Sequence, residues 1–206
     1  IDLGYDTAPI DGSVLTANIS SVTGLDVNTK NIADLTGIED FTALIYLGCW
    51  QNQITSLDLS NNLALSGLRC YNNQISSLDF SNNPDLVLLE CQNNQISSLD
   101  VSNNPDLYRL ECQNNQISTL DLSNNPGIDN LLCYSNQLQS LDLRNIPLTN
   151  FFPNSTVFYR TFNALNNPDL GCIYVDDVSY ATAFMTNKDY TTSYATNEAE
   201  CDAIAL

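Results

Sequence analysis

Five cysteines recur at intervals of 21 residues, and this step constrains the fold more than any other feature of the sequence. They are Cys49, Cys70, Cys91, Cys112 and Cys133. An asparagine three residues after each cysteine keeps the same step, at Asn52, Asn73, Asn94, Asn115 and Asn136. Self-similarity at a period of about 20–50 residues indicates a solenoid, in which each copy forms one turn and neighbouring turns bury each other's apolar edges.

Each copy is divided into two halves of the same pattern. The pattern Leu-x-x-Leu-x-apolar-x-x-Asn occupies Leu65, Leu68, Cys70 and Asn73, and again Ile75, Leu78, Phe80 and Asn83. Apolar residues two apart point to one side, as in a short strand, and neither half has the ten or so residues of a helix. We therefore predict a mainly-β solenoid, namely a leucine-rich repeat right-handed superhelix with strand-like segments on both sides, low curvature and a cap at each end.

The pattern divides the chain into three parts. Residues 1–21 lack the repeat and are interpreted as an N-terminal cap, whereas residues 22–148 hold a first turn of 22 residues and five turns of 21 residues. Residues 149–206 are interpreted as a degenerate last turn and a C-terminal cap. Residues 1–6 suggest the end of a short helix, and we expect another short helix that uses Asp176 or Asp177 as its N-cap.

The repeat resembles that of bacterial secreted and cell-surface leucine-rich repeat proteins of the internalin J-like group, which have nested 21-residue repeats and a cysteine ladder. The residues that carry this resemblance are Leu65, Leu68, Cys70, Asn73, Ile75, Leu78, Asp79, Phe80, Asn83 and their copies through Asn136. The flanking segments IDLGYD at the start, LTGIEDFTAL at 35–44 and CIYVDD at 172–177 resemble those of surface proteins from bacteria that use type IX secretion. The resemblance implies a secreted or cell-surface protein.

The charge balance excludes several classes of partner. The chain has 24 acidic and six basic residues, no histidine and a net charge of −18. Such a surface repels phosphate backbones and anionic lipid head groups, so we expect neither nucleic-acid binding nor membrane insertion. No apolar run approaches the roughly 20 residues of a membrane span. We expect a monomer, and because no signal peptide is present before Ile1, we interpret the chain as a mature or trimmed form.

The cysteines fall into two groups with different chemistry. The five ladder cysteines recur once per turn at an apolar site, without the clustering of metal ligands, and neighbouring strands about 4.8 Å apart hold Cβ atoms too far apart for disulfides. We predict that they are free, buried thiols. Cys172 and Cys201 lie outside the ladder, and in an exported protein we expect them to form a disulfide, whereas free thiols are the alternative for a cytosolic protein.

The outward side chains of the second half of each turn form what we call the second-strand face. Its main feature is a column of carboxylates at Asp58, Asp79, Asp100, Asp121 and Asp142, flanked by serine or threonine. Carboxylates spaced at about 4.8 Å repel one another unless they accept backbone hydrogen bonds, are hydrated or share cations. We favour local hydrogen bonding and hydration, with weak calcium or sodium binding as the alternative, and we expect no resident cofactor.

The outward side chains of the first half of each turn form the first-strand face, where residue types vary most between turns. The candidate ligand-binding residues on this face are Tyr46, Trp50, Arg69, Tyr71, Glu90, Gln92, Arg109, Glu111, Gln113 and Tyr134. We expect Trp50 to stack on Tyr71, and the four charged residues to form a charged centre. Aromatic and arginine side chains predominate in binding hot spots, so we predict a non-catalytic module that binds a protein. A glycan ligand or a plain structural spacer is the alternative.

An enzyme is the competing interpretation of the same face. Glu90 and Glu111 occupy adjacent turns, so their carboxyl groups are expected about 5 Å apart, the separation that retaining glycosidases use. However, no deep, dry pocket is predicted around them, and Arg69 and Arg109 account for the pair as a salt-bridge network. We therefore predict that the protein is not an enzyme.

Overall fold

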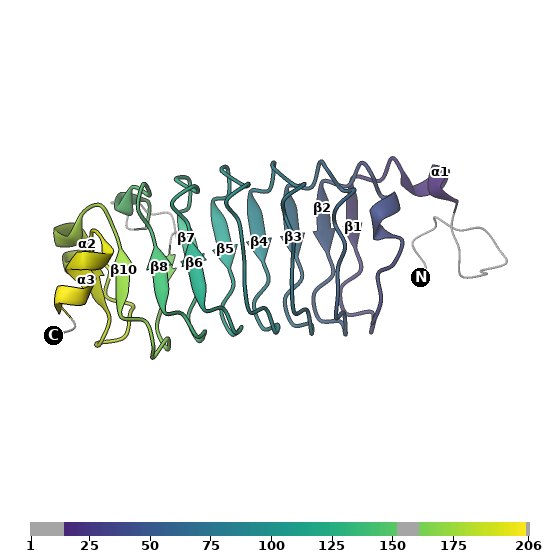
Figure 1. Cartoon of the computed structure of the whole chain (residues 1–206). Helices are drawn as coiled ribbons and strands as arrows, with labels where there is room; N and C mark the ends of the chain where they lie inside the picture. Colours follow the sequence, from purple (N-terminus) through teal and green to yellow (C-terminus); the bar gives the residue numbers. More distant parts are fainter. Residues whose placement is uncertain (1–14, 152–160, 205–206) are drawn as a thin grey trace.

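The computed structural model describes residues 15–151 and 161–204, and it forms a rod of stacked turns with little curvature (Figure 1). The solenoid prediction is thus confirmed. The expected helix end in residues 1–6 and part of the loop after residue 148 lie outside the described residues. In the described part of the chain, no helix has the length and apolar character needed to cross a membrane.

The first halves of the turns form a continuous seven-stranded sheet. Its strands are β1 (Gly24–Asp26), β2 (Tyr46–Gly48), β3 (Gly67–Arg69), β4 (Leu88–Glu90), β5 (Arg109–Glu111), β7 (Asn130–Leu132) and β9 (Thr161–Asn163), all parallel and in this order. The register places each middle residue beside its counterpart, so that Leu47, Leu68 and Leu89 form a column. This column is fully buried, as the alternating pattern predicts.

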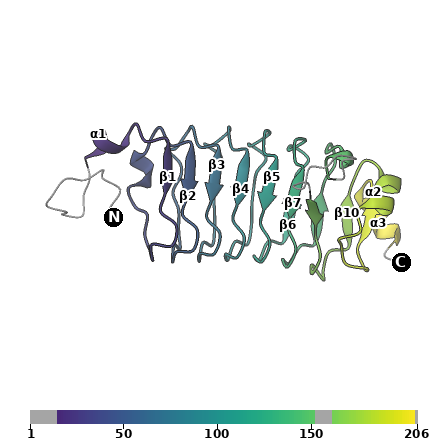
Figure 2. The same cartoon turned by 180° about the vertical axis from the view of Figure 1, so that it is seen from behind.

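The second halves form a shorter sheet on the other side of the rod, and Figures 1 and 2 show the rod from two opposite sides. Its parallel strands are β6 (Thr119–Asp121), β8 (Ser140–Asp142), β10 (Cys172–Tyr174) and β11 (Ser193–Ala195). The equivalent segments of the earlier turns, residues 56–58, 77–79 and 98–100, are not paired as strands. Leu57 and Leu78 are also only partly buried there. Strand-like segments on both sides are therefore confirmed, but strand pairing on the second side begins only at β6.

Two asparagine ladders hold successive turns together. In the first ladder, Asn94 donates from Nδ2 to the carbonyls of Cys70 and Cys91, both at 3.0 Å, and its Oδ1 accepts from the backbone N–H of Ile75 at 2.9 Å. In the second ladder, Asn83 donates to the carbonyls of Leu59 and Asn62, at 3.2 and 2.9 Å. The ladders therefore satisfy backbone groups that the bends leave without a strand partner.

The five ladder cysteines are free and have no exposed surface. Burial raises the pKa of the Cys49 and Cys112 thiols to about 12. Because the thiolate is the reactive form, these side chains act as small apolar groups in the core.

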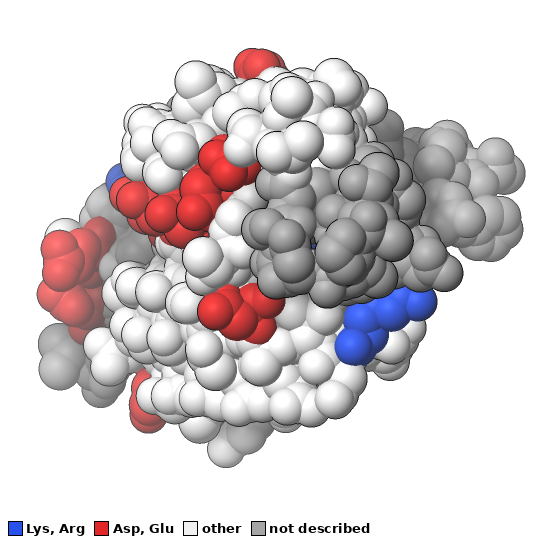
Figure 3. Space-filling model, turned by 90° about the vertical axis from the view of Figure 1, so that its right-hand side faces the viewer, with Lys and Arg blue, Asp and Glu red and all other residues white. Residues whose placement is uncertain are grey.

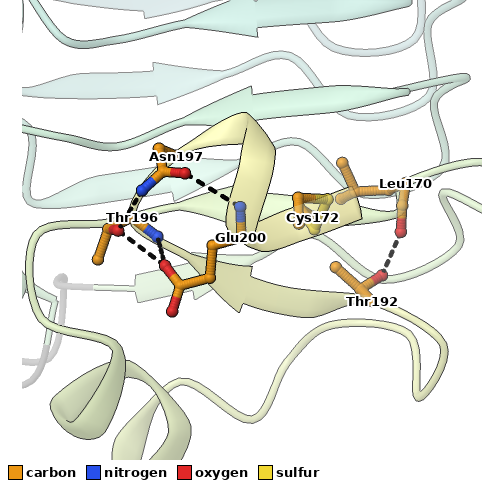
Figure 4. The surroundings of a disulfide bond; sticks show 7 residues. Leu170, Cys172, Thr192, Thr196, Asn197 and Glu200 are labelled. Carbon is orange, nitrogen blue, oxygen red and sulfur yellow. Dashed lines mark hydrogen bonds between the residues drawn. A yellow bond between two sulfur atoms is a disulfide. The ribbon is translucent and has the colours of Figure 1, made fainter. Parts of the chain in front are cut away.

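The C-terminal cap is joined to the second sheet by a disulfide. Cys172 of β10 is bonded to Cys201 of α3 (Glu198–Ile204), with their Cα atoms 6.1 Å apart (Figure 4). Asn197 caps this helix by accepting the N–H of Glu200 at 3.0 Å, and Glu200 accepts the N–H of Thr196 at 2.7 Å. The predicted disulfide is present in the structure.

The remaining helices lie at the two ends of the rod. They are α1 (Thr16–Ile19), the 3-10 turns η1 (Ile38–Asp40) and η2 (Leu148–Asn150), and α2 (Val178–Phe184). The helix expected after Asp176 or Asp177 is α2, and its N-cap is Asp177, which accepts the N–H of Tyr180 at 2.9 Å. In the same cap, Asp189 accepts hydrogen bonds from the backbone N–H groups of Asn166 and Asn167. In a repeat, the next turn would supply acceptors on this side, and here Asp189 takes that place.

Candidate binding face

The N-terminal part of the first-strand face is an aromatic cluster. Trp50 and Tyr71 follow β2 and β3 by two residues, and their rings stack with centroids 5.5 Å apart and planes inclined by 14°. This stacking confirms the expectation from the 21-residue spacing. Tyr46 begins β2, and its ring lies 5.8 Å from the guanidinium carbon of Arg69. The cluster therefore presents rings and a cation side by side.

Two glycines provide the room that these rings occupy. A Cβ atom added to Gly48 would lie 2.6 Å from Cζ3 of Trp50 and 3.1 Å from the hydroxyl of Tyr46. A Cβ atom on Gly67 would lie 3.2 Å from Cδ2 of Tyr46. The rings thus lie over bare backbone, and any side chain at Gly48 would displace Trp50.

Next along the face lies the charged centre of Arg69, Glu90, Arg109 and Glu111. Glu90 lies between the two arginines, with Oε2 3.2 Å from Nε of Arg69 and Oε1 3.0 Å from Nε of Arg109. Arg109 also donates from Nη2 to Oε1 of Glu111 at 2.6 Å. The four residues therefore form one connected network across β3, β4 and β5.

Burial sets the electrostatics of this centre. Glu90 and Glu111 are 6% and 9% exposed, so the outward-pointing carboxylates are covered by their neighbours instead of facing water. Desolvation raises the pKa of Glu111, an effect that Glu90 reinforces and Arg109 opposes. Because arginine cations hold oxygens of both carboxylates, the geometry is that of an ion-pair network rather than that of a free acid and nucleophile.

The structure separates the remaining candidates into two groups. Gln92 donates from Nε2 to Oε2 of Glu111 at 3.3 Å and belongs to the charged centre. Gln113 lies one turn further on, is only 6% exposed and contacts the Glu111 carboxylate, which differs from the freely outward position that its spacing suggests. Tyr134 is partly buried and lies three turns beyond Tyr71, about 14 Å along the rod at 4.8 Å per strand.

The second-strand face is built from local hydrogen bonds. The Oδ1 atom of each column aspartate accepts the backbone N–H of the residue two positions on, at 2.9–3.0 Å, from Ser60, Ser81, Ser102, Ser123 and Arg144. These hydrogen bonds lower the pKa of Asp58, Asp79 and Asp100. This arrangement agrees with the local interpretation of the column.

An open depression on the same face lies between the turns around Asp79, Asp100 and Asp121, where Leu78 and Leu99 form part of its lining. Among the described residues, no group of three or more acidic, cysteine or histidine side chains is placed to hold a metal ion. Acidic side chains also gather in several groups at the N-terminal end of the rod, where basic ones show in few places (Figure 3).

Sequence reasoning missed a row of apolar side chains beside the first-strand face. Ile45 and Tyr108, each one residue before a strand, are 45% and 44% exposed, and Val87 and the polar Ser66 lie between them in the same 21-residue register. The 21-residue register could have revealed these side chains, because the position just before the strand holds an apolar residue in three turns.

Comparison with known proteins agrees with this architecture. A segment of 44 residues, 21% of this chain, is 50% identical to internalin J of Listeria monocytogenes and covers 5% of that protein. The crystal structure of an internalin (inlF) from the same species is 25% identical in sequence and has a TM-score of 0.58. The match covers 88% of this chain and 50% of the inlF chain. The leucine-rich repeat domain of APL1 is 18% identical in sequence and has a TM-score of 0.60. The match covers 88% of this chain and 52% of the APL1 chain.

No family model matches the sequence. The chain spans only a small part of the curated relative and about half of each of these two structures. The parallel sheets, the stacked leucines and these likenesses agree. The chain is a leucine-rich repeat solenoid, similar over a 44-residue segment to internalin J and in its fold to a second Listeria internalin.

Proposed function

We propose that this chain is a non-catalytic extracellular module that binds a protein through the first-strand face. The observation that carries the proposal is the aromatic cluster of Tyr46, Trp50 and Tyr71 beside Arg69, which Glu90 links to Arg109. Aromatic and arginine side chains supply most hot-spot energy in protein interfaces. The second-strand face, in contrast, repeats the same short polar residues from turn to turn.

Several features support a site of action outside the cell, on its surface or secreted from it. The disulfide between Cys172 and Cys201 suits an oxidising compartment. A 44-residue segment of the chain is similar to internalin J. The chain acts as a monomer in this proposal, since the ligand takes the partly exposed aromatic and arginine side chains.

A glycan is the alternative ligand, and the geometry favours it less. Sugars stack on open ring faces, whereas Trp50 and Tyr71 cover one face of each other. Gln113, which could bind sugar hydroxyl groups, is buried. The protein ligand is therefore the first candidate to test.

The test uses a photo-crosslinker to find the ligand and the face together. We would place p-benzoylphenylalanine at Gln92 on the first-strand face and, as a matched control, at Ser98 on the second-strand face, and expose both proteins to host or neighbouring-cell surfaces and to a glycan array. A crosslinked protein from Gln92 alone is the expected result.

Affinity for the captured protein then tests the residues. The double change Trp50→Ala and Tyr71→Ala is expected to weaken binding by about thirtyfold or more, as loss of a hot spot does. The control pair Ser77→Ala and Ser98→Ala should leave affinity unchanged. If only the serine pair weakens binding, the ligand uses the opposite face.

A further inference from the structure

The charged centre has two layers that differ in exposure. The side chains of Glu90 and Glu111 are 8% and 11% exposed, whereas those of Arg69 and Arg109 are 39% and 26% exposed. Two positive and two negative charges make this centre neutral by count. Its accessible layer, however, consists mainly of the two arginine side chains, whose Nε atoms are buried against the carboxylates beneath them.

The hydrogen-bonding capacity of the two layers differs in the same direction. Both oxygens of Glu90 are held by arginines, and those of Glu111 are held by Arg109 and Gln92. A guanidinium has more N–H groups than these contacts use, and it has no acceptor. An incoming group therefore meets spare donors on Arg69 and Arg109 but few spare acceptors on the glutamates.

The surroundings favour a short-range contact with an anion. Arg69 lies against Tyr46, and the Trp50–Tyr71 stack lies next to it, so apolar rings limit hydration on that side. The aspartate column lies on the other face of the rod, and Asp26 is the acidic residue outside the charged centre that lies near Tyr46 and Tyr71. Charges separated by more than about 8 Å are largely screened at physiological salt. The net charge of −18 therefore weakens this contact only partly.

We propose that Arg69 and Arg109 bind a carboxylate in an acidic peptide segment of the protein ligand, next to an apolar residue that contacts Tyr46, Trp50 and Tyr71. This inference rests on the proposed function and names the chemistry that its face recognises. Planar guanidinium groups bind carboxylates through paired, charge-assisted hydrogen bonds, and the adjacent rings supply apolar contact area.

The test needs no knowledge of the natural ligand. We would measure the binding of the folded chain to an array of synthetic peptides in which Asp or Glu follows an aromatic or aliphatic residue, each paired with the peptide that carries Asn or Gln instead. Acidic peptides are expected to bind at least about tenfold more tightly than their amide partners, because charge-assisted hydrogen bonds are lost in the amides.

Variants of the chain locate the contact. Arg69→Gln should abolish the preference for acidic peptides. Arg69→Lys keeps the positive charge but not the paired N–H donors of the guanidinium group, so it should restore only part of the preference. The matched control is Arg144→Gln on the second-strand face, because Arg144 is also paired with a carboxylate, that of Asp142, and lies 5.6 Å from the ring of Tyr174. This control should bind like the parent chain.

Each outcome decides the inference. The inference is overturned if acid and amide peptides bind equally, or if none of the peptides binds. It is also overturned if both Arg69 variants keep the preference for acidic peptides, or if the arginines bind only acidic oligosaccharides. The proposed function fails separately: it falls if the protein captured by crosslinking binds equally well after Trp50→Ala and Tyr71→Ala. If that binding is lost while peptide acidity has no effect, the binding face stands and only the carboxylate inference falls.

Discussion

The first-strand and second-strand faces are built from the same 21-residue pattern, yet their side chains make different contacts. On the first-strand face, contacts run between turns, as in the Trp50–Tyr71 stack and the bridge from Arg109 to Glu90. On the second-strand face, each column aspartate accepts a hydrogen bond from its own turn, as Asp100 does from Ser102. One face is coupled along the rod, and the other consists of separate local turns.

Side-chain length explains much of this difference. Neighbouring turns are about 4.8 Å apart, a gap that arginine, glutamate and aromatic side chains span and that serine and aspartate do not. The backbone differs too, because the first sheet is continuous from β1 to β9 and the second begins only at β6. A solenoid can thus place its variable, interacting side chains over the better-paired sheet.

The largest expected effect compares the asparagine ladders under the two faces. Asn115 accepts the N–H of Ile96 and donates to the carbonyls of Cys91 and Cys112, whereas Asn104 only donates to carbonyls. We expect Asn115→Ala to lower the free energy of unfolding by about 3 kcal/mol or more, and Asn104→Ala by about 2 kcal/mol, since each buried group left without a partner costs about 1 kcal/mol or more. Urea denaturation measures both, and equal losses would show that the bond to Ile96 contributes nothing.

A second comparison concerns one carboxylate from each face. Glu90→Gln leaves the partly buried guanidinium of Arg69 without its anion and Arg109 with Glu111 alone, and we expect a loss of about 1–2 kcal/mol in the free energy of unfolding after allowing for their solvent access. Asp100→Asn keeps an oxygen that can accept the N–H of Ser102, and little change is expected. Urea midpoints measure the pair, and a larger loss for Asp100→Asn would reverse the comparison.

The pH dependence of stability should also differ between the faces. The raised pKa of Glu111 makes its contribution fully present below the ordinary value of 4.5 and lost as pH rises through the raised value. The lowered pKa of Asp58, Asp79 and Asp100 makes theirs present above 3.8 and lost as pH falls through the lowered values.

Stability should therefore rise on acidification from pH 7 toward about 4.5 and fall below about 3.8. The variant Glu111→Gln should lose part of the rise and keep the fall. Guanidinium denaturation at several pH values measures both limbs. A rise of the same size in Glu111→Gln would remove Glu111 as one of its causes.

The smallest expected effect concerns a backbone position at the end of the first half-turn. Gln51 has a φ of 55°, the left-handed conformation that asparagine adopts at Asn72, Asn93 and Asn114 in later turns. We expect Gln51→Asn to raise the free energy of unfolding by about 0.5 kcal/mol, because asparagine tolerates this conformation better. The same change at exposed Gln95, where φ is not positive, serves as the control, and an equal gain there would exclude a backbone cause.

Sequence reasoning succeeded where a residue's neighbours are copies of itself. The buried cysteines, the recurring asparagines and the stack of Trp50 on Tyr71 follow from spacing, whereas N-cap preference predicted a helix after Asp176 or Asp177 and the structure shows Asp177 as its cap. It did not foresee that Asp189 would close the last turn, because Asp189 lies 23 and 22 residues after its partners Asn166 and Asn167 with no repeat between them to set their register. The start of strand pairing at β6 also carries no signal in the pattern.

The sequence by itself determined which side chains point inward, because a strand alternates its faces and a 21-residue period brings each inward position beside its own copy. Only the tertiary structure decided which outward side chains remain accessible. Glu90 and Glu111 became buried and Arg69 stayed partly exposed because unlike side chains on adjacent turns cover one another. That covering depends on the length and direction of each neighbour, which the repeat pattern does not specify.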